Sequence, residues 1–208
     1  MVKEIYGKKI GMTQIFTQDG VAVPVTAIEV EPLTVVAKKT TDKDGYNAIV
    51  VSFGQIKEKN ANKPHKGIFE KAGVEVKRYL REIKVENVDE YEIGSTITVD
   101  VFTTEDHVDV QGTSKGKGFQ GVIKRYGSHR GPTTHGSNYH RRPGSMGACA
   151  TPGRVIKGKK LPGHMGNQTS SILNLDVVKV DTDKNVILVK GSVPGAKKSI
   201  VRVRESVK

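Results

Sequence analysis

With 208 residues, the chain is long enough to bury a hydrophobic core without a disulfide or a structural metal. Its single cysteine, Cys149, cannot form an internal disulfide, and its first ten residues lack the apolar run of a signal peptide, so we expect a cytoplasmic protein. No run of about 18 apolar residues is present, which excludes a membrane-spanning helix. The net charge of +12 indicates an anionic partner.

The positive charge is concentrated in one segment, residues 110–175. No Asp or Glu occurs in these 66 residues, whereas 11 of the chain's 34 Lys and Arg residues lie there. The rest of the chain contains the other 23 basic residues and all 22 acidic ones, so its net charge is +1. Because exposed surfaces normally mix both signs, this local polycation predicts binding to nucleic acid.

The chain begins with short runs of β-branched and apolar residues separated by turn signals. These runs predict strands at residues 9–16, 21–29, 33–40 and 46–53. The connections contain Asp19-Gly20 and Asp44-Gly45, dipeptides that tolerate positive φ and suit hairpins. The pattern indicates an antiparallel barrel or sandwich.

A small insertion of mixed α/β character follows at residues 55–94. Pro64 suits the first turn of a helix that Gly73 ends, and a strand is predicted at 76–85. Alternating residues predict strands at 95–102 and 104–112, and three more at 172–180, 185–190 and 199–205. The chain therefore leaves a mainly β body and later returns to it.

The excursion between these strands, residues 113–168, is here called the arm. From residue 124 to 154 there is no Val, Ile or Leu, so the arm has no hydrophobic core of its own, and we expect a long extended basic loop ordered by a partner. The predicted domain division is barrel strands at 1–54, an inserted subdomain at 55–94, barrel strands at 95–112, the arm at 113–168, and completion of the barrel at 169–208.

The arm supplies the groups that bind folded RNA: cations for phosphates, glycines that let the backbone approach, and aromatic rings, Phe119, Tyr126 and Tyr139, that stack on open bases. RNA is favoured over DNA because no helix is suited to the major groove. The predicted RNA-contact residues are Lys115, Lys117, Phe119, Lys124, Arg125, His129, Arg130, His135, Tyr139, His140, Arg141, Arg142, Arg154, Lys157, Lys159, Lys160 and His164.

Several alternatives explain these residues less well. Gly116, Gly118 and Gly121 form a G-x-G-x-x-G pattern, but no acidic residue follows before Asp176, which disfavours a dinucleotide site. The four arm histidines lack nearby carboxylates, which disfavours zinc binding and acid-base catalysis. A purely solvated role for these histidines stays open. We interpret Cys149 as a small packing residue rather than a nucleophile.

Three other protein classes also remain: a standalone RNA chaperone or translation-factor-like module, an enzyme on such a barrel, and an architectural DNA-binding protein. The chaperone would sediment mostly as free protein, outside any large RNA-protein particle. The enzyme would need a pocket of convergent titratable groups, for which the sequence offers no candidate. The DNA-binding protein would need a groove-reading element.

Ordered motifs along nearly the whole chain resemble the universal large-subunit ribosomal proteins of the L-three type, in their bacterial form. These motifs are Gly7-Lys8-Lys9-Ile10-Gly11-Met12-Thr13, Ser114-Lys115-Gly116-Lys117-Gly118-Phe119-Gln120-Gly121, His135-Gly136-Ser137, Pro143-Gly144-Ser145-Met146-Gly147, Lys157-Gly158-Lys159-Lys160, Gly163-His164-Met165-Gly166-Asn167, Asn174-Leu175-Asp176-Val177-Val178 and Val189-Lys190-Gly191-Ser192-Val193-Pro194-Gly195.

The resemblance implies a barrel related to those of translation factors and a structural role in the large ribosomal subunit, with no enzymatic activity, cofactor, metal, membrane contact or homo-oligomer. It implies early binding to large-subunit rRNA and neighbours of the L-fourteen and L-nineteen types. Ala148-Cys149-Ala150 replaces the methylated glutamine of some members. The implied arm tip, near the peptidyl transferase centre, is Gly144, Ser145, Met146, Gly147, Ala148, Cys149, Ala150, Thr151 and Pro152.

Overall fold

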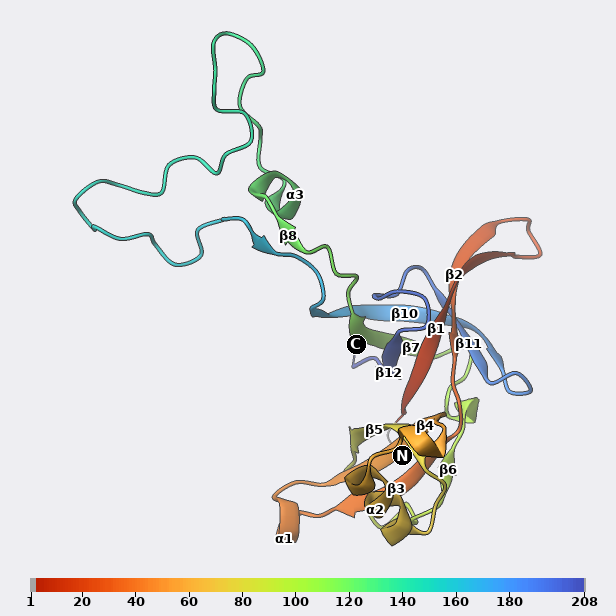
Figure 1. Ribbon diagram of the computed structural model, residues 1–208. Helices are drawn as coiled ribbons and strands as arrows, with labels where there is room; N and C mark the ends of the chain where they lie inside the picture. The colour runs from red at the N-terminus through yellow and green to blue at the C-terminus, as the bar shows by residue number, and fades with distance from the viewer. Residues whose placement is uncertain (1–2, 208) are drawn as a thin grey trace. The chain divides into compact units, whose positions relative to one another are not determined.

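A computed structural model describes residues 3–207 (Figure 1). The chain divides into two compact units, one containing the residues up to Thr113 together with those from Thr169 onward, and the other Ser114–Gln168. The second unit covers the predicted arm except for residue 113. No helix among the described residues is long and apolar enough to cross a membrane.

The first unit contains a closed barrel of six antiparallel strands in the order β1-β12-β7-β10-β11-β2. Alternate side chains point inward, and cross-strand pairs such as Ile5 with Val203 and Val203 with Val110 form its core. Closure leaves no free sheet edge along the paired segments. The prediction of a mainly β protein with a barrel is confirmed. The strands are β1 (Glu4–Phe16), β2 (Ala22–Glu29), β7 (His107–Thr113), β10 (Thr169–Asp181), β11 (Val186–Lys190) and β12 (Ile200–Glu205).

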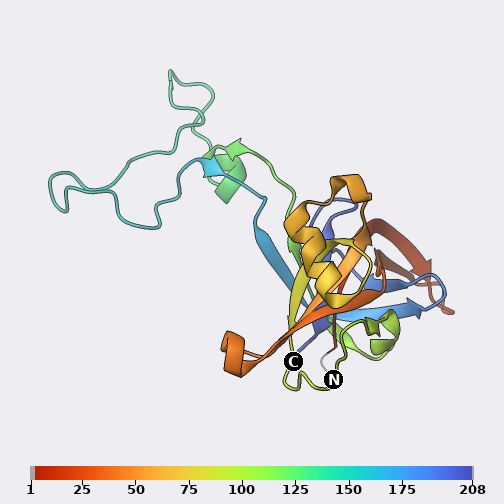
Figure 2. The ribbon, with the colours of Figure 1, turned by 60° about the horizontal axis from the view of Figure 1, so that its bottom comes forward.

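A second sheet lies in the same unit, with the order β5-β4-β3-β6. Helix α2 begins with Pro64 in its first turn and ends at Gly73, which has a φ of 67°, as predicted. It lies against this sheet (Figure 2) and buries Phe69 completely. The strands are β3 (Leu33–Lys39), β4 (Ala48–Gln55), β5 (Lys77–Lys84) and β6 (Thr96–Ile97), and the helices are α1 (Thr41–Asp44), α2 (Lys63–Ala72), and 3-10 turns at Glu58–Asn60 and Val99–Val101.

This sheet corrects the predicted division of the body. Strands β3 and β4 were expected in the barrel but pair with each other, with β5 on the outer side of β4 and β6 on the outer side of β3. Only β7 from residues 95–112 therefore joins the barrel. Periodicity identifies a strand but not its partner, which explains the error. The strand expected at 95–102 is also shortened, because Thr98 Oγ1 donates to Asp100 Oδ2 at 2.9 Å where the chain turns into the 3-10 segment.

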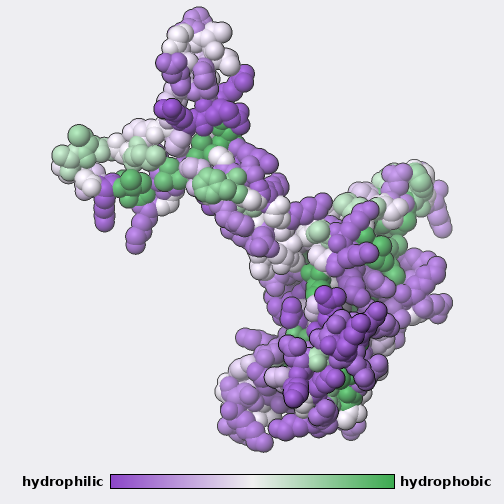
Figure 3. All heavy atoms as spheres, in the orientation of Figure 1, coloured by the Kyte–Doolittle hydropathy of each residue, from purple (hydrophilic) through white to green (hydrophobic). Residues whose placement is uncertain are grey.

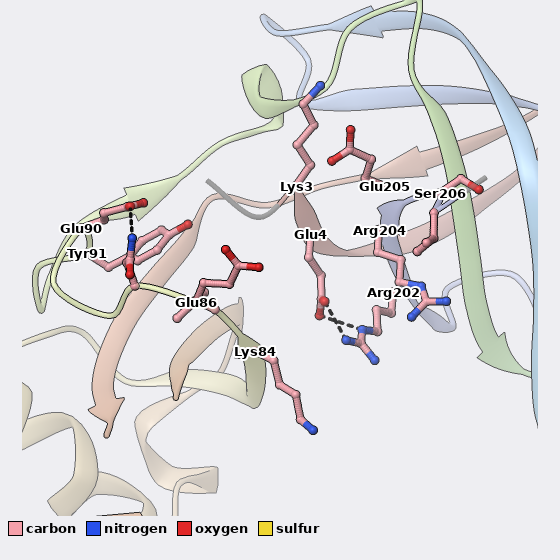
Figure 4. A pocket seen from close by; sticks show the side chains of 13 residues that line it. Lys3, Glu4, Lys84, Glu86, Glu90, Tyr91, Arg202, Arg204, Glu205 and Ser206 are labelled. Atoms are coloured by element: carbon pink, nitrogen blue, oxygen red, sulfur yellow. Dashed lines mark hydrogen bonds and ion pairs between the residues drawn. The ribbon is translucent and has the colours of Figure 1, made fainter. Parts of the chain in front are cut away.

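An ion pair inside the first unit connects the two ends of the chain. Arg202 donates from Nε and Nη2 to the two carboxylate oxygens of Glu4, at 2.7 and 2.6 Å (Figure 4). These hydrogen bonds hold the pKa of Arg202 above its ordinary value. The Glu4 side chain is only 4% exposed, so its charge depends on this partner rather than on water.

Replacing Arg202 by Met is expected to lower the free energy of unfolding by about 2 kcal/mol, because it leaves the Glu4 carboxylate buried and unpaired. The value lies below that of fully buried pairs since Arg202 is 29% exposed. Urea denaturation of the free protein measures it. The double variant Glu4→Gln, Arg202→Met should recover part of the loss, and unchanged stability in the single variant would contradict this account.

Candidate nucleic-acid interface

The base of the arm is an antiparallel stem. The Ser114 and Lys117 amides donate to the carbonyls of Gln168 and Met165, both at 2.9 Å, and β8 (Phe119–Gln120) pairs with β9 (Gly163–His164). Gly166 has a φ of 75°, and a Cβ there would lie 2.1 Å from the Lys115 carbonyl oxygen. Only glycine permits this approach. The stem therefore pairs a segment that carries Lys115 and Lys117 with a segment, distant in sequence, that carries His164.

Beyond the stem, α3 (Val122–Tyr126) joins the two sides of the arm. Arg125 Nη1 donates to the Leu161 carbonyl at 2.8 Å, and the Arg125 guanidinium lies 5.0 Å from the centre of the Tyr126 ring. Lys160 Nζ lies 6.0 Å from the same ring. Tyr126 thus gathers two cations from opposite sides of the arm, while 41% of its surface stays exposed for a base.

The outer part of the arm is held by backbone contacts instead of a core. The Gly131 amide donates to the His140 carbonyl at 2.9 Å, and a Cβ on Gly131 would lie 1.9 Å from the Tyr139 carbonyl oxygen. His140 Nδ1 is 2.8 Å from the Pro132 carbonyl, and the Tyr139 hydroxyl accepts from the Gly144 amide. Tyr139 and His140, predicted as RNA contacts, therefore also shape this loop.

All 17 predicted RNA-contact residues lie in the second unit, and all are exposed except Arg125, which is half-buried. Within residues 3–207, every ion pair joins side chains of the first unit, for example Lys3 with Asp106 at 2.7 Å and Arg204 with Asp109 at 3.0 Å. No carboxylate side chain compensates the cations of the arm, because the arm contains none. Its positive charge is available to phosphates.

The implied arm tip consists of small exposed residues, with Met146 its one large apolar side chain at 47% exposure. Cys149 is exposed, so the interpretation of it as a packing residue is wrong. Its neighbours Ala148 and Ala150 are too small to cover it, and no branched apolar residue lies in this loop. The tip offers backbone groups and small side chains for close approach rather than charge.

Other chemistries find little support elsewhere in the described chain. Residues 3–207 contain no group of three His, Cys, Asp or Glu side chains placed to hold a metal ion. The G-x-G-x-x-G segment contains the two-residue strand β8 and is followed by the five-residue helix α3, so it is not part of a βαβ unit. A cleft of about 540 Å³ in the first unit is lined by cations and carboxylates together, among them Lys84, Glu86 and Glu205 (Figure 4), unlike a phosphate site.

Sequence reasoning missed how some residues support the interface. Tyr126, considered only as a stacking ring, is the point where Arg125 and Lys160 converge. Arg125 is held by the carbonyl of Leu161, which is a backbone group, so no residue type in the sequence indicates this contact. The adjacency of Arg125 and Tyr126 was the available hint, whereas the approach of Lys160 depends on the fold.

Comparisons with known proteins agree with this geometry. The sequence model of the family described as Ribosomal protein L3 matches residues 8–186. A relative named Large ribosomal subunit protein uL3, from Carboxydothermus hydrogenoformans, is 59% identical over 208 residues, which is 100% of this chain and 99% of the relative. The resemblance inferred from the motifs is confirmed. The chain belongs to the ribosomal protein L3 family.

Proposed function

We propose that this chain, a structural constituent of the large ribosomal subunit and not an enzyme, binds the subunit's rRNA directly through the exposed cations of its arm. The observation that carries the proposal is the charge of the second unit, which has cations on its outgoing and returning segments and no carboxylate side chain. Phosphates neutralised by these cations release counterions, which supplies affinity that falls with salt.

The same arrangement supports a mechanism in which the arm stabilises folded RNA. Glycines at Gly131 and Gly166 bring backbone segments into close contact, so the arm is thin enough to lie between RNA helices. Phe119, at 76% exposure, and Tyr126 present rings for unpaired bases. The arm becomes ordered as it binds. Its cations then lie where the phosphates of the folded RNA are close together, and they reduce the repulsion between those phosphates.

Finer assignments rest on the family resemblance and belong to this proposal. The arm tip, residues 144–152, extends toward the peptidyl transferase centre, where its small residues hold nucleotides in place without taking part in chemistry. Binding to rRNA early helps to nucleate subunit assembly. Neighbouring proteins of the L-fourteen and L-nineteen types complete its surroundings, in a particle that is cytoplasmic in bacteria.

Sedimentation of cell extract through sucrose gradients, at moderate and then high salt, tests the proposal. We expect one copy per large subunit, retained after a high-salt wash, because many phosphate contacts dissociate together only at high ionic strength. Recovery mainly at the top of the gradient would contradict an integral role and favour the standalone RNA chaperone.

A further inference from the structure

Strands β1 and β2 continue beyond the barrel as a two-stranded ribbon, residues 11–24 (Figure 1). Strand β12 pairs with β1 only over Glu4–Lys8, and β11 pairs with β2 only over Val25–Glu29. Among the described residues, no third strand pairs with the outer part of the ribbon. A two-stranded hairpin alone is marginally stable in water, so this extension calls for a partner.

One face of the ribbon is exposed and mainly apolar, with Gln14 as its polar member. The register pairs Phe16 with Ala22 and Gln14 with Pro24, which places these side chains and that of Met12 on a common face. Phe16 is 67% exposed and Met12 52% exposed. Figure 3 shows hydrophobic colour on this extension of the first unit. Contiguous apolar exposure of this kind marks an interaction surface.

The charge of the ribbon distinguishes its partner from RNA. Residues 10–28 contain no Lys or Arg and one acidic residue, Asp19, in a chain of net charge +12. The exposed ring of Tyr126 in the arm lies 5.0 Å from the Arg125 guanidinium, whereas the ribbon that carries Phe16, residues 11–24, contains no Lys or Arg. Lys197 lies beside Gly11 at the barrel end of the ribbon, but the ribbon supplies no cation of its own to neutralise phosphates, and the Asp19 carboxylate would repel them.

We propose that the apolar face formed by Met12, Phe16, Ala22 and Pro24 docks on an apolar patch of another large-subunit protein, bordered by a Lys or Arg that faces Asp19. This inference rests on the proposed place of the chain in the large subunit. Phe16 is the anchor of the contact, because a large aromatic side chain that becomes buried dominates such interfaces. Asp19 fixes the orientation of the ribbon by charge complementarity.

Site-specific photo-crosslinking in assembled large subunits tests the occupant. The photoreactive residue p-benzoylphenylalanine replaces Phe16 in one variant and Phe119 in another, so that two exposed aromatic positions are compared under identical conditions. We expect a ribonuclease-resistant adduct with a different protein at position 16 and an adduct with rRNA at position 119. An adduct with rRNA at position 16, an adduct between two copies of this chain, or no adduct at 16 would overturn the inference.

The two positions also separate this inference from the proposed function. If position 16 forms no adduct with another protein while position 119 forms an adduct with rRNA, only the docking face is rejected. Failure of both variants and wild type to enter large subunits rejects the proposed function, and the docking face with it.

A second measurement uses conservative and disruptive changes at the same residue. Phe16→Ser should lower incorporation into large subunits about tenfold in competition with tagged wild type, whereas Phe16→Leu should stay close to wild type. The unfolding midpoint of each free protein should match wild type, since Phe16 is largely exposed. Equal incorporation of the Ser and Leu variants would overturn the inference.

Discussion

Replacing Lys157, Lys159 and Lys160 together by Gln is expected to lower the affinity of the free protein for large-subunit rRNA roughly 10²- to 10³-fold at about 0.1 M salt. Each lysine is exposed and has no carboxylate partner, so each is free to neutralise a phosphate. The slope of log affinity against log salt should fall by about three units, one for each contact. Filter binding over a range of salt concentrations measures both quantities.

A matched variant separates these contacts from the loss of net charge. Lys43, Lys71 and Lys184 are exposed lysines of the first unit, and each adjoins an acidic residue in sequence. Their replacement by Gln removes the same three charges but should leave the salt slope within about one unit of wild type. Equal slopes in the two triple variants would show that net charge, not the arm, governs binding.

The interface was predictable from sequence to the extent that its signal is local. The absence of acidic residues over 66 positions and the absence of Val, Ile and Leu over 31 are properties of one continuous segment. They predict an exposed, positively charged segment without a hydrophobic core, whatever the fold of the rest of the chain. The predicted contact residues are accordingly exposed, with Arg125 held inward by the Leu161 carbonyl.

Features that depend on pairing between distant segments could not be predicted. The strand patterns at β3 and β4 were recognised, but their placement in a second sheet depends on β5, more than 20 residues further on. The convergence of Lys160 on Tyr126 likewise depends on the stem register. Composition and periodicity describe each segment by itself, so they do not indicate which distant segment it pairs with.

The motif at the start of the chain shows why a basic residue need not be an RNA contact. Lys9 is 8% exposed, and its Nζ donates to the carbonyls of Val193 at 2.5 Å and Gly195 at 3.3 Å. A Cβ on Gly7 would lie 2.7 Å from the Glu29 carbonyl oxygen. Both residues therefore serve packing of the barrel, whereas the cations of the arm other than Arg125 are exposed to solvent.

Replacing Phe53 by Ala is expected to lower the free energy of unfolding by about 3–5 kcal/mol. Phe53, on β4, is 1% exposed, and its ring lies 5.7 Å from that of Tyr6 on β1 and 5.3 Å from that of Tyr79 on β5, measured between centroids. This aromatic cluster joins the barrel to the second sheet within one core. The Ala variant leaves a cavity between β1, β4 and β5. Because the strands of the closed barrel cannot move inward, the cavity is not filled.

Phe53→Leu provides the control, because it keeps most of the volume and should cost only about 1–1.5 kcal/mol. Urea denaturation measures both variants, and equal losses would mean that the cavity is not the cause. At salt and temperature where the variant remains folded, the salt slope of its rRNA binding should equal that of wild type, since the arm contributes the phosphate contacts. The arm triple variant should show the reverse, a reduced slope at unchanged stability, because the core of the first unit and the charge of the arm have separate physical origins.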